Sequence, residues 1–503
     1  MTFETGPDTS TDPSLSRLAD ALLIPPFPGR EAPAWVLEAL ADGLAGVTVF
    51  GPNIDGTEQL GALIAGLRAA ADEPIVAIDE EGGDVTRIAH LTGSPYPGNA
   101  ALGAVDDPAL TRAVYQALGA DLAALGVTLN LAPSVDVNTA ADNPVIGTRS
   151  FGADPALVAR HAAAAVTGLQ AAGVAACAKH FPGHGSTSID SHHAVATVSG
   201  SMDLIARRDL PPFVAAIEAG VRTVMPGHLL IPGLAGDLPA SLSAAAQTGL
   251  LRGELGFAGV IVSDALEMRA VSAPYGIPEA AVMAVAAGTD LLCFGRDQDR
   301  ATYLRVRDAL VEAVRSGRLL AARLEESAER VWELRHWVTA ARQLAAGQGQ
   351  GSPDVGLVAA RRALRLYGEP GRLTNAVLVE IVPPSNIAVG MVPWGLSRWV
   401  HPGSVHRIGT NLPPTAANTA AAANTAAAAA GRPLLVVVRD AHRYPVAQSV
   451  VLALLASRPD AVIVEMGLPV WRPPAQAYLV TFGATHASSL AAAEMLGLAS
   501  GPT

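Results

Sequence analysis

Ionisable side chains gather at the ends of short apolar runs in the first two thirds of the chain. Lys179 closes one such run, Asp79 follows a second and Asp264 follows a third. Cations and carboxylates bind polar substrates, and imidazoles donate and accept protons near neutral pH. A domain with a purely structural role would not need these groups repeated at one end of its strands. The pattern therefore predicts an active site.

The elements that must position these residues alternate along the chain. Eight apolar or β-branched runs are predicted to be strands: Ala21–Ile24, Gly46–Phe50, Pro74–Ile78, Val127–Leu131, Ala175–Lys179, Arg222–Met225, Gly259–Ser263 and Asp290–Phe294. Ala-rich helical segments such as Pro108–Leu125 separate them. This order indicates parallel βαβ units, which fit a closed (β/α)₈ barrel of the TIM type better than an open doubly wound sheet. The C-terminal ends of barrel strands meet at one face, which carries the active site.

The α/β barrel is predicted to be followed by a second, smaller domain. The barrel is expected over residues 18–342 and a linker over residues 343–357, because Gly347–Pro353 is rich in Gly and Gln. A smaller α/β domain, similar to an αβα sandwich, is expected over residues 358–503, with strands at Asn375–Val382, Leu434–Arg439, Ala461–Met466 and Ala477–Thr481. The Ala/Asn/Thr-rich insert Ala416–Ala430 is interpreted as a surface excursion without a function.

Composition excludes several classes of function. The 503 residues carry 34 Lys and Arg against 46 Asp and Glu, a net charge of −12, which argues against nucleic-acid binding and against a polybasic membrane-surface protein. No apolar stretch reaches the roughly 18 residues of a membrane span, and the N-terminus lacks the pattern of a secretory signal. The two cysteines, Cys177 and Cys293, cannot form a disulfide framework or a Cys-rich zinc cluster. The expected location is the cytoplasm.

Two sequence motifs carry a resemblance to a known family. Lys-His-Phe-Pro-Gly-His-Gly occupies positions 179–185 and is followed by Asp-Ser-His at 190–192, and Val-Ser-Asp-Ala-Leu-Glu-Met occupies positions 262–268. Together they resemble glycoside hydrolase family 3, and more narrowly its β-N-acetylglucosaminidase branch, which trims N-acetylglucosamine from muropeptides. The resemblance covers the barrel from Leu22 to Val331 and extends more weakly over the second domain.

The resemblance implies hydrolysis with retention through a covalent intermediate. Such a reaction needs a carboxylate nucleophile and a proton donor for the leaving oxygen. Asp264 is the expected nucleophile, although an Asp after a strand also commonly caps the next helix. The resemblance places the proton donor on His192, oriented by Asp190, in place of a second carboxylate. His193 is the neighbouring imidazole, but the motif assigns the role to His192.

The resemblance also implies which residues bind the substrate. The expected partner is a small glycoside or oligosaccharide, and no metal or cofactor is expected. Glu80 and Glu81 receive no assigned role, because negative charge beside the nucleophile would raise its pKa. His184 is expected to shape the pocket. The expected substrate-binding residues are Asp79, Arg87, Arg149, Lys179, His180 and His228.

The sequence departs from the family pattern at a few positions. Glu80, Asp84, Ser186 and Ala265 stand where the family often has Gln, Arg, Asp and Asp. All four lie near the expected rim of the site. They therefore concern what is recognised beyond the glycone rather than the class of reaction.

Three other functions compete with hydrolysis. The same site could transfer the sugar to phosphate, because a neutral histidine repels an anionic acceptor less than a carboxylate does. A metal-dependent amidohydrolase-type barrel is disfavoured because Pro25-Pro26-Phe27 stands where its His-x-His pair is needed, and because Pro182 and Gly183 separate His180 from His184. A binding protein without activity is disfavoured because the expected nucleophile and dyad are all present.

Overall fold

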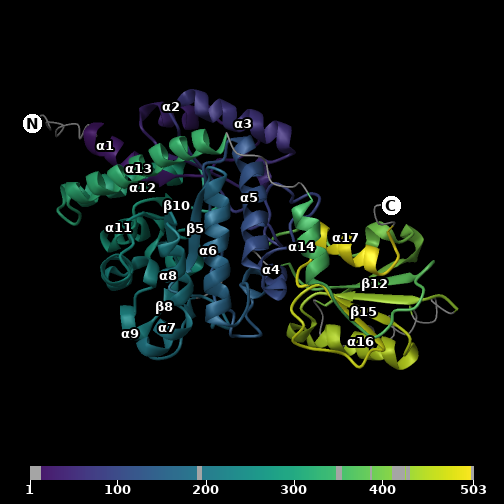
Figure 1. Cartoon of the computed structure of the whole chain (residues 1–503). Coiled ribbons are helices and arrows are strands. Elements are labelled where there is room, and N and C mark those ends of the chain that lie inside the picture. Colours follow the sequence, from purple (N-terminus) through teal and green to yellow (C-terminus); the bar gives the residue numbers. More distant parts are fainter. Residues whose placement is uncertain are drawn as a thin grey trace, which may run out of the picture.

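The fold is taken from a computed structural model of the chain. An N-terminal barrel, purple to green in Figure 1, is followed by a smaller domain, green to yellow. The structure describes residues 13–189, 195–346, 354–385, 388–410, 425 and 431–499.

All strands of the barrel run parallel. A six-stranded sheet has the order β2-β3-β4-β5-β7-β9, and β1 pairs with β10. A β-bridge between Val262 and Leu291 joins β9 to β10. The backbone N–H of Thr48 in β2 donates to the carbonyl oxygen of Pro25, directly after β1, at 3.2 Å. These two contacts close the strands into a ring. The predicted (β/α)₈ fold is confirmed. Its strands in the described part of the chain are β1 (Leu23–Ile24), β2 (Gly46–Val49), β3 (Ile75–Ile78), β4 (Leu129–Asn130), β5 (Ala175–Phe181), β7 (Thr223–Pro226), β9 (Val260–Ile261) and β10 (Leu292–Cys293).

Helices surround this ring and bury the outer faces of its strands. Asp107 and Asp154 start two of the longest helices, α5 and α6, by accepting backbone N–H groups of the first turn, and a proline follows each at the first helical position. The helices of the barrel domain are α1 (Pro13–Asp20), α2 (Ala34–Asp42), α3 (Thr57–Ala70), α4 (Asn99–Val105), α5 (Pro108–Leu125), α6 (Pro155–Ala171), α7 (Met202–Arg208), α8 (Pro211–Glu218), α9 (Pro232–Ala235), α10 (Arg269–Tyr275), α11 (Ile277–Ala287), α12 (Arg300–Arg315) and α13 (Ala321–Ala345).

The inside of the barrel is a packed core. Alternate strand residues, including Ala77, Leu129 and Cys177, form one apolar cluster with Leu334 of α13. Arg335 on the same helix donates to the carbonyl oxygen of Glu73 (2.8 Å), just before β3. Helix α13 therefore covers the N-terminal ends of the strands and leaves their C-terminal ends open.

The C-terminal domain is a three-layer αβα sandwich. Its sheet has the order β11-β16-β15-β14-β12-β13, in which only β11 runs antiparallel to its neighbour. One apolar cluster lies between the sheet and α16, and another lies between the sheet and the pair α14 and α17. Its elements are α14 (Val355–Ala363), β11 (Arg365–Tyr367), β12 (Val377–Val382), β13 (Val405–Gly409), β14 (Leu434–Val438), α16 (Pro445–Ser457), β15 (Val462–Glu465), β16 (Ala477–Val480) and α17 (His486–Met495).

The two domains are joined closely. Helix α14 packs against α4 and α5 of the barrel as well as against α17 (Figure 1). Helices α13 and α14 extend into both ends of the predicted linker 343–357, and residues 347–353 lie outside the described residues. Most of the insert Ala416–Ala430 also lies outside them.

A helix that spans a membrane must be both long and apolar. No single described helix meets both requirements. Helices α10 and α11 meet them only when taken together, and the two are bent by 108° relative to each other.

Candidate active site

A cavity of about 450 Å³ opens at the C-terminal ends of the barrel strands. Residues at the end of β5 and directly after β3, β9 and β10 line it. Loop 388–392 of the C-terminal domain forms a further part of its wall. The cavity therefore lies where a (β/α)₈ barrel carries its active site, and the second domain contributes to it.

Lys179, at the end of β5, lies between two carboxylates that follow β3. Its Nζ is 2.7 Å from Asp79 Oδ1 and 3.0 Å from Glu81 Oε1, and its side chain is buried. Burial by itself would lower the pKa of Lys179, but the two negative charges outweigh it and raise the pKa. The ammonium group therefore stays charged. It is the only lysine in a chain with 34 Lys and Arg residues, so every other such position is arginine.

Arg149 reaches Glu81, one of these two carboxylates, from the loop after β4. Its Nε and Nη2 donate to the two carboxylate oxygens of Glu81 at 2.9 and 2.8 Å. Burial would raise the pKa of Glu81, but the charges of Arg149 and Lys179 outweigh it and hold the pKa far below its usual range. Glu81 is thus neutralised and adds no free negative charge to the cavity. We call this set the β3–β5 wall: Asp79, Glu81, Arg149, Lys179 and His180.

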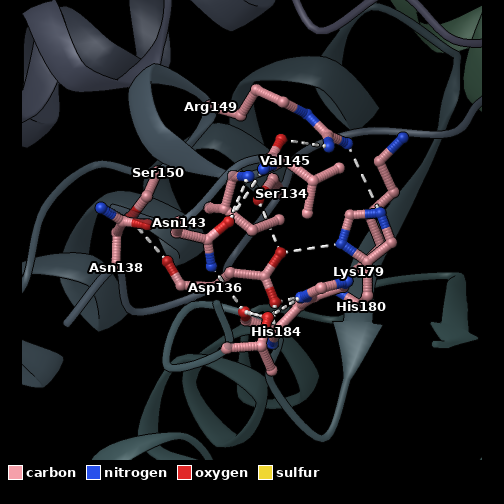
Figure 2. Close-up of polar contacts among 12 residues, drawn as sticks. Ser134, Asp136, Asn138, Asn143, Val145, Arg149, Ser150, Lys179, His180 and His184 are labelled. Atoms are coloured by element: carbon pink, nitrogen blue, oxygen red, sulfur yellow. Dashed lines mark hydrogen bonds and ion pairs between the residues drawn. The ribbon is translucent and has the colours of Figure 1, made fainter. Parts of the chain in front are cut away.

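A buried carboxylate fixes both histidines of the Lys-His-Phe-Pro-Gly-His-Gly segment (Figure 2). Asp136 Oδ2 lies 2.8 Å from His180 Nδ1, and Asp136 Oδ1 accepts the backbone N–H of His184 at 2.7 Å. On the other side of the ring, His180 Nε2 lies 3.4 Å from Arg149 Nη2. Burial and the neighbouring His180 lower the pKa of His184 to about 4, so this side chain is neutral at pH 7. His180 is therefore oriented at both ring nitrogens.

Arg87 links the loop after β3 to the C-terminal domain. Its Nη2 donates to the Ala388 carbonyl oxygen (3.0 Å) and lies 3.8 Å from Asp79 Oδ2. Glu80 shapes this loop, because its Oε2 accepts the backbone N–H groups of Arg87 and Ile88 at 2.8 and 2.9 Å. Glu80 does not line the cavity. Glu80, which stands where the family often has Gln, therefore has a structural role.

Asp84 is a second departure with a structural role. Asp84 contacts two residues of the C-terminal domain. Its Oδ1 accepts the backbone N–H of Ala484 at 2.9 Å, and its Oδ2 lies 2.9 Å from Arg439 Nη2. Thr148, beside Arg149 in the barrel, also donates to Oδ2 (2.7 Å). One buried carboxylate thus fixes the two domains against each other next to the site.

Asp264 lies across the cavity from the β3–β5 wall. It follows β9, which stands half-way round the strand ring from β3. Its Oδ1 accepts the backbone N–H of Ala265 at 2.8 Å. Fully buried His228 holds this backbone, because its Nε2 lies 3.0 Å from the Ala265 carbonyl oxygen while its Nδ1 lies 2.6 Å from Ser241 Oγ.

Glu267 stands beside Asp264 in the cavity lining. Burial raises the pKa of Glu267 to about 8, and the charge of Asp264 adds to the rise. Its side chain rests against Gly295, directly after β10. We call this side of the cavity the β9–β10 wall: Asp264, Ala265, Glu267 and Gly295.

The structure brings together most of the predicted site residues. His228 is the exception among the described ones, because it lies outside the cavity lining and acts on the backbone beside Asp264 instead. The predicted dyad, Asp190 and His192, lies outside the described residues. No three described His, Cys, Asp or Glu residues are grouped as a metal site would need. The predicted residues that do line the cavity are Asp79, Arg87, Arg149, Lys179, His180 and Asp264.

Three residues of the site are missing from the sequence prediction. Glu81 could be placed after β3 from the sequence, but its negative charge argued against a role beside the nucleophile. Its ion pairs with Arg149 and Lys179 show that this charge is neutralised. Asp136 follows β4 in the loop beyond its C-terminal end. Its position after a strand was the only feature of the sequence that could have indicated a role in the site. Glu267 has no signal besides its place in the Val-Ser-Asp-Ala-Leu-Glu-Met motif.

A second cavity, of about 470 Å³, lies between the two domains next to the first. Val145, Arg149 and residues 389–392 line both cavities. Trp394 and Tyr444 add aromatic faces to the second cavity, and Arg443 adds a guanidinium group. The two cavities together form a site that continues from the barrel into the domain interface.

Comparisons with known proteins agree with this architecture. The model of the glycosyl hydrolase family 3 N terminal domain matches residues 28–334. Beta-hexosaminidase LpqI of Mycobacterium tuberculosis is 36% identical over 321 residues, which are 63% of this chain and 81% of LpqI. Beta-hexosaminidase A of Pseudoalteromonas piscicida is 33% identical over 58% of this chain, which spans about half (53%) of that relative.

A solved structure covers both domains. The glycoside hydrolase family 3 beta-N-acetylglucosaminidase of Paenibacillus sp. str. FPU-7 matches 97% of each chain at 33% identity, with a TM-score of 0.83. Its match includes the C-terminal domain, which the family model does not reach. With the barrel, the cavity and these matches in agreement, the chain belongs to glycosyl hydrolase family 3 and is a glycoside hydrolase.

Proposed function

We propose that the chain is a retaining, exo-acting β-N-acetylglucosaminidase that releases terminal N-acetylglucosamine. The observation that carries the proposal is that Asp264 lines the same cavity as the β3–β5 wall. A retaining glycosidase needs a carboxylate that reaches the anomeric carbon while other groups hold the sugar. The names of the relatives, β-hexosaminidase and β-N-acetylglucosaminidase, support the choice of sugar.

Asp264 acts as the nucleophile in this proposal. Its carboxylate oxygen bonds to the anomeric carbon while the bond from that carbon to the leaving oxygen breaks, which leaves a glycosyl-aspartate ester. Water then attacks the same carbon, the ester bond breaks and the carboxylate is restored. Two inversions give net retention. The His228 contact with Ala265 holds the backbone beside the reacting carboxylate, which keeps the nucleophile in position.

Asp190 and His192 supply the acid and base. The imidazolium of His192 gives its proton to the leaving oxygen in the first step, and the neutral ring accepts a proton from water in the second. Asp190 orients the ring and favours its protonated form. The support for these two roles is the sequence motif, together with the position of His184, earlier in the same segment, in the cavity lining.

The β3–β5 wall binds the sugar. Its charges are balanced within the protein, so its groups can exchange hydrogen bonds with hydroxyls without an unpaired buried charge. Arg87 ties this wall to loop 388–392 of the second domain, which encloses the cavity from the side. Such an enclosure favours the end of a glycan over its middle, as an exo-acting enzyme requires.

The aglycone lies in the interdomain cavity in this proposal. Arg443 has no carboxylate partner among the described residues and packs over the ring of Tyr444 (5.6 Å). These groups suit a second sugar ring that carries an acidic substituent. Of the two candidate substrates, this acidic substituent favours a muropeptide, because a chitin fragment is neutral and would give Arg443 no anionic partner. The activity then belongs to cell-wall recycling in the cytoplasm.

The test is product analysis on an aryl β-N-acetylglucosaminide with and without phosphate. Free N-acetylglucosamine at the same rate in both cases is the expected result. N-Acetylglucosamine 1-phosphate with a rate increase would instead make the enzyme a phosphorylase. A parallel assay with a chelator separates the metal-dependent alternative, because only that alternative loses activity. No cleavage of the glycoside under any of these conditions would contradict the proposal.

A further inference from the structure

Glu267 carries a buried carboxyl oxygen for which the mechanism above has no use. Its Oε2 atom is buried and has no hydrogen-bond partner among the described residues. Buried polar atoms are nearly always hydrogen-bonded, so an exception at a binding site indicates a missing partner. Glu267 lines the cavity in which the sugar is expected. Oε2 itself has no accessible surface, so rotation of the carboxyl group has to bring it to the cavity, where a ligand oxygen is its natural partner.

The backbone after β10 leaves room for this carboxyl group. Gly295 has a φ of +87°, and a Cβ atom at this position would collide with Glu267 Oε1 and Oε2. Any side chain at position 295 would displace the carboxyl group from the wall. Gly295 thus gives the carboxyl group its place at the cavity, a hydrogen bond to the backbone of Glu267 itself helps to fix it, and the described residues form no ion pair with it.

The charges around Glu267 favour its protonated form. Asp264 and Asp297 are the nearby carboxylates, and Arg296 is the nearby cation, but Arg296 is bound to Asp297 at 3.1 Å. The Cys293 thiol lies on the neighbouring strand, and burial raises its pKa to about 12, so it adds no charge. Burial and the two carboxylates raise the pKa of Glu267 to about 8. At pH 7 the group is mostly a neutral acid.

We propose that Glu267 binds the sugar as a neutral carboxylic acid, donating its proton to a sugar oxygen beside Asp264. The inference rests on the proposed function, because it requires a sugar in this cavity. A neutral acid can donate a hydrogen bond without placing a second negative charge beside the nucleophile. When Glu267 ionises, the donor is lost and two carboxylates face the same sugar. Activity then falls at alkaline pH.

The experiment compares Glu267→Gln with Glu267→Leu. Gln keeps a hydrogen-bond donor that does not titrate, whereas Leu keeps only approximate volume. The substrate is a 2,4-dinitrophenyl β-N-acetylglucosaminide, whose leaving group needs no proton from His192. The pH dependence of kcat/KM then reports the groups that bind the sugar and the nucleophile, and not the acid.

The expected result has three parts. In the wild-type enzyme, kcat/KM declines above about pH 8. In Glu267→Gln, kcat/KM at pH 7 stays within about fivefold of the wild-type value and does not decline at alkaline pH. In Glu267→Leu, kcat/KM is lower than in the wild type by about 10- to 100-fold at every pH. Asp297→Asn, which removes a neighbouring charge, shifts the decline to slightly lower pH. A decline that persists in Glu267→Gln, or equal losses in Gln and Leu, would overturn the inference. Failure of the wild-type enzyme to cleave the substrate would instead contradict the proposed function.

Discussion

The two walls of the cavity treat their carboxylates in opposite ways. On the β3–β5 wall, cations lie 2.7 to 3.0 Å from Asp79 and Glu81 and outweigh the effect of burial, so the pKa of both acids is lowered. On the β9–β10 wall, burial prevails at Glu267 and its pKa rises to about 8. The difference separates two tasks. In the proposed function, one wall holds fixed charges that bind the sugar. The other wall holds the nucleophile Asp264 and the carboxyl group of Glu267, whose protonation changes with pH.

Asp264→Asn should have the largest effect on activity. An amide of the same shape cannot form the glycosyl ester, so kcat should fall by at least about 10³-fold. The side chain is only half-buried, so the free energy of unfolding should change little. Kinetics and urea denaturation measure both quantities, with Asp237→Asn, an exposed surface substitution, as the control. If Asp264→Asn retained activity within tenfold of the wild type, Asp264 would not be the nucleophile.

Lys179→Met should affect both stability and activity, because it removes the 2.7 Å partner of Asp79 and leaves Glu81 paired with Arg149 alone. Removal of one partner from a buried ion pair costs roughly 3–5 kcal/mol in the free energy of unfolding. Lys179→Arg tests the geometry, because a planar guanidinium cannot replace a compact charge between two carboxylates. We expect Arg to recover stability only in part, measured by urea denaturation, and not to recover kcat/KM. Full recovery by Arg would mean that only the charge matters here.

The unfolding free energy should respond to pH differently in Glu267→Gln and in the wild type. The unfolded chain releases this proton near the ordinary pKa of 4.5, whereas the folded chain keeps it up to about 8. The folded state therefore binds more protons in this window, and wild-type stability falls as the pH rises from about 4.5 to 8. After allowance for solvent screening, the contribution is about 1–2 kcal/mol. Subtracting the Glu267→Gln curve isolates it, and parallel curves would contradict the account of this wall.

Arg443→Ala should have the smallest effect and should depend on the substrate. The residue lies in the interdomain cavity, beyond both walls. Loss of one solvent-accessible cation contact should raise KM for an acidic disaccharide about two- to fivefold and leave KM for an aryl glycoside unchanged. Steady-state kinetics on the two substrates measures the difference. An equal change for both substrates would place the aglycone elsewhere.

The sequence predicted the barrel better than it predicted the contacts within the site. All barrel strands were recognised because each is a short apolar run between helices, whereas β11 and β13 at the sheet edges are more polar and were missed. Strand ends placed Asp79 and Asp264 correctly at one cavity. His228 also follows a strand, but the direction of its side chain depends on packing against Ser241 and cannot be derived from spacing.

The central claim is that Asp264 forms a covalent bond to the sugar. The most direct test is mass spectrometry of the enzyme after reaction with a 5-fluoro N-acetylglucosaminyl fluoride. The fluoride leaving group speeds formation of the ester, and the ring fluorine slows its hydrolysis, so the intermediate accumulates. The account predicts one added sugar per chain, on the peptide that contains Asp264. An adduct on another carboxylate, or turnover of a β-N-acetylglucosaminide with inversion and no adduct, would contradict it.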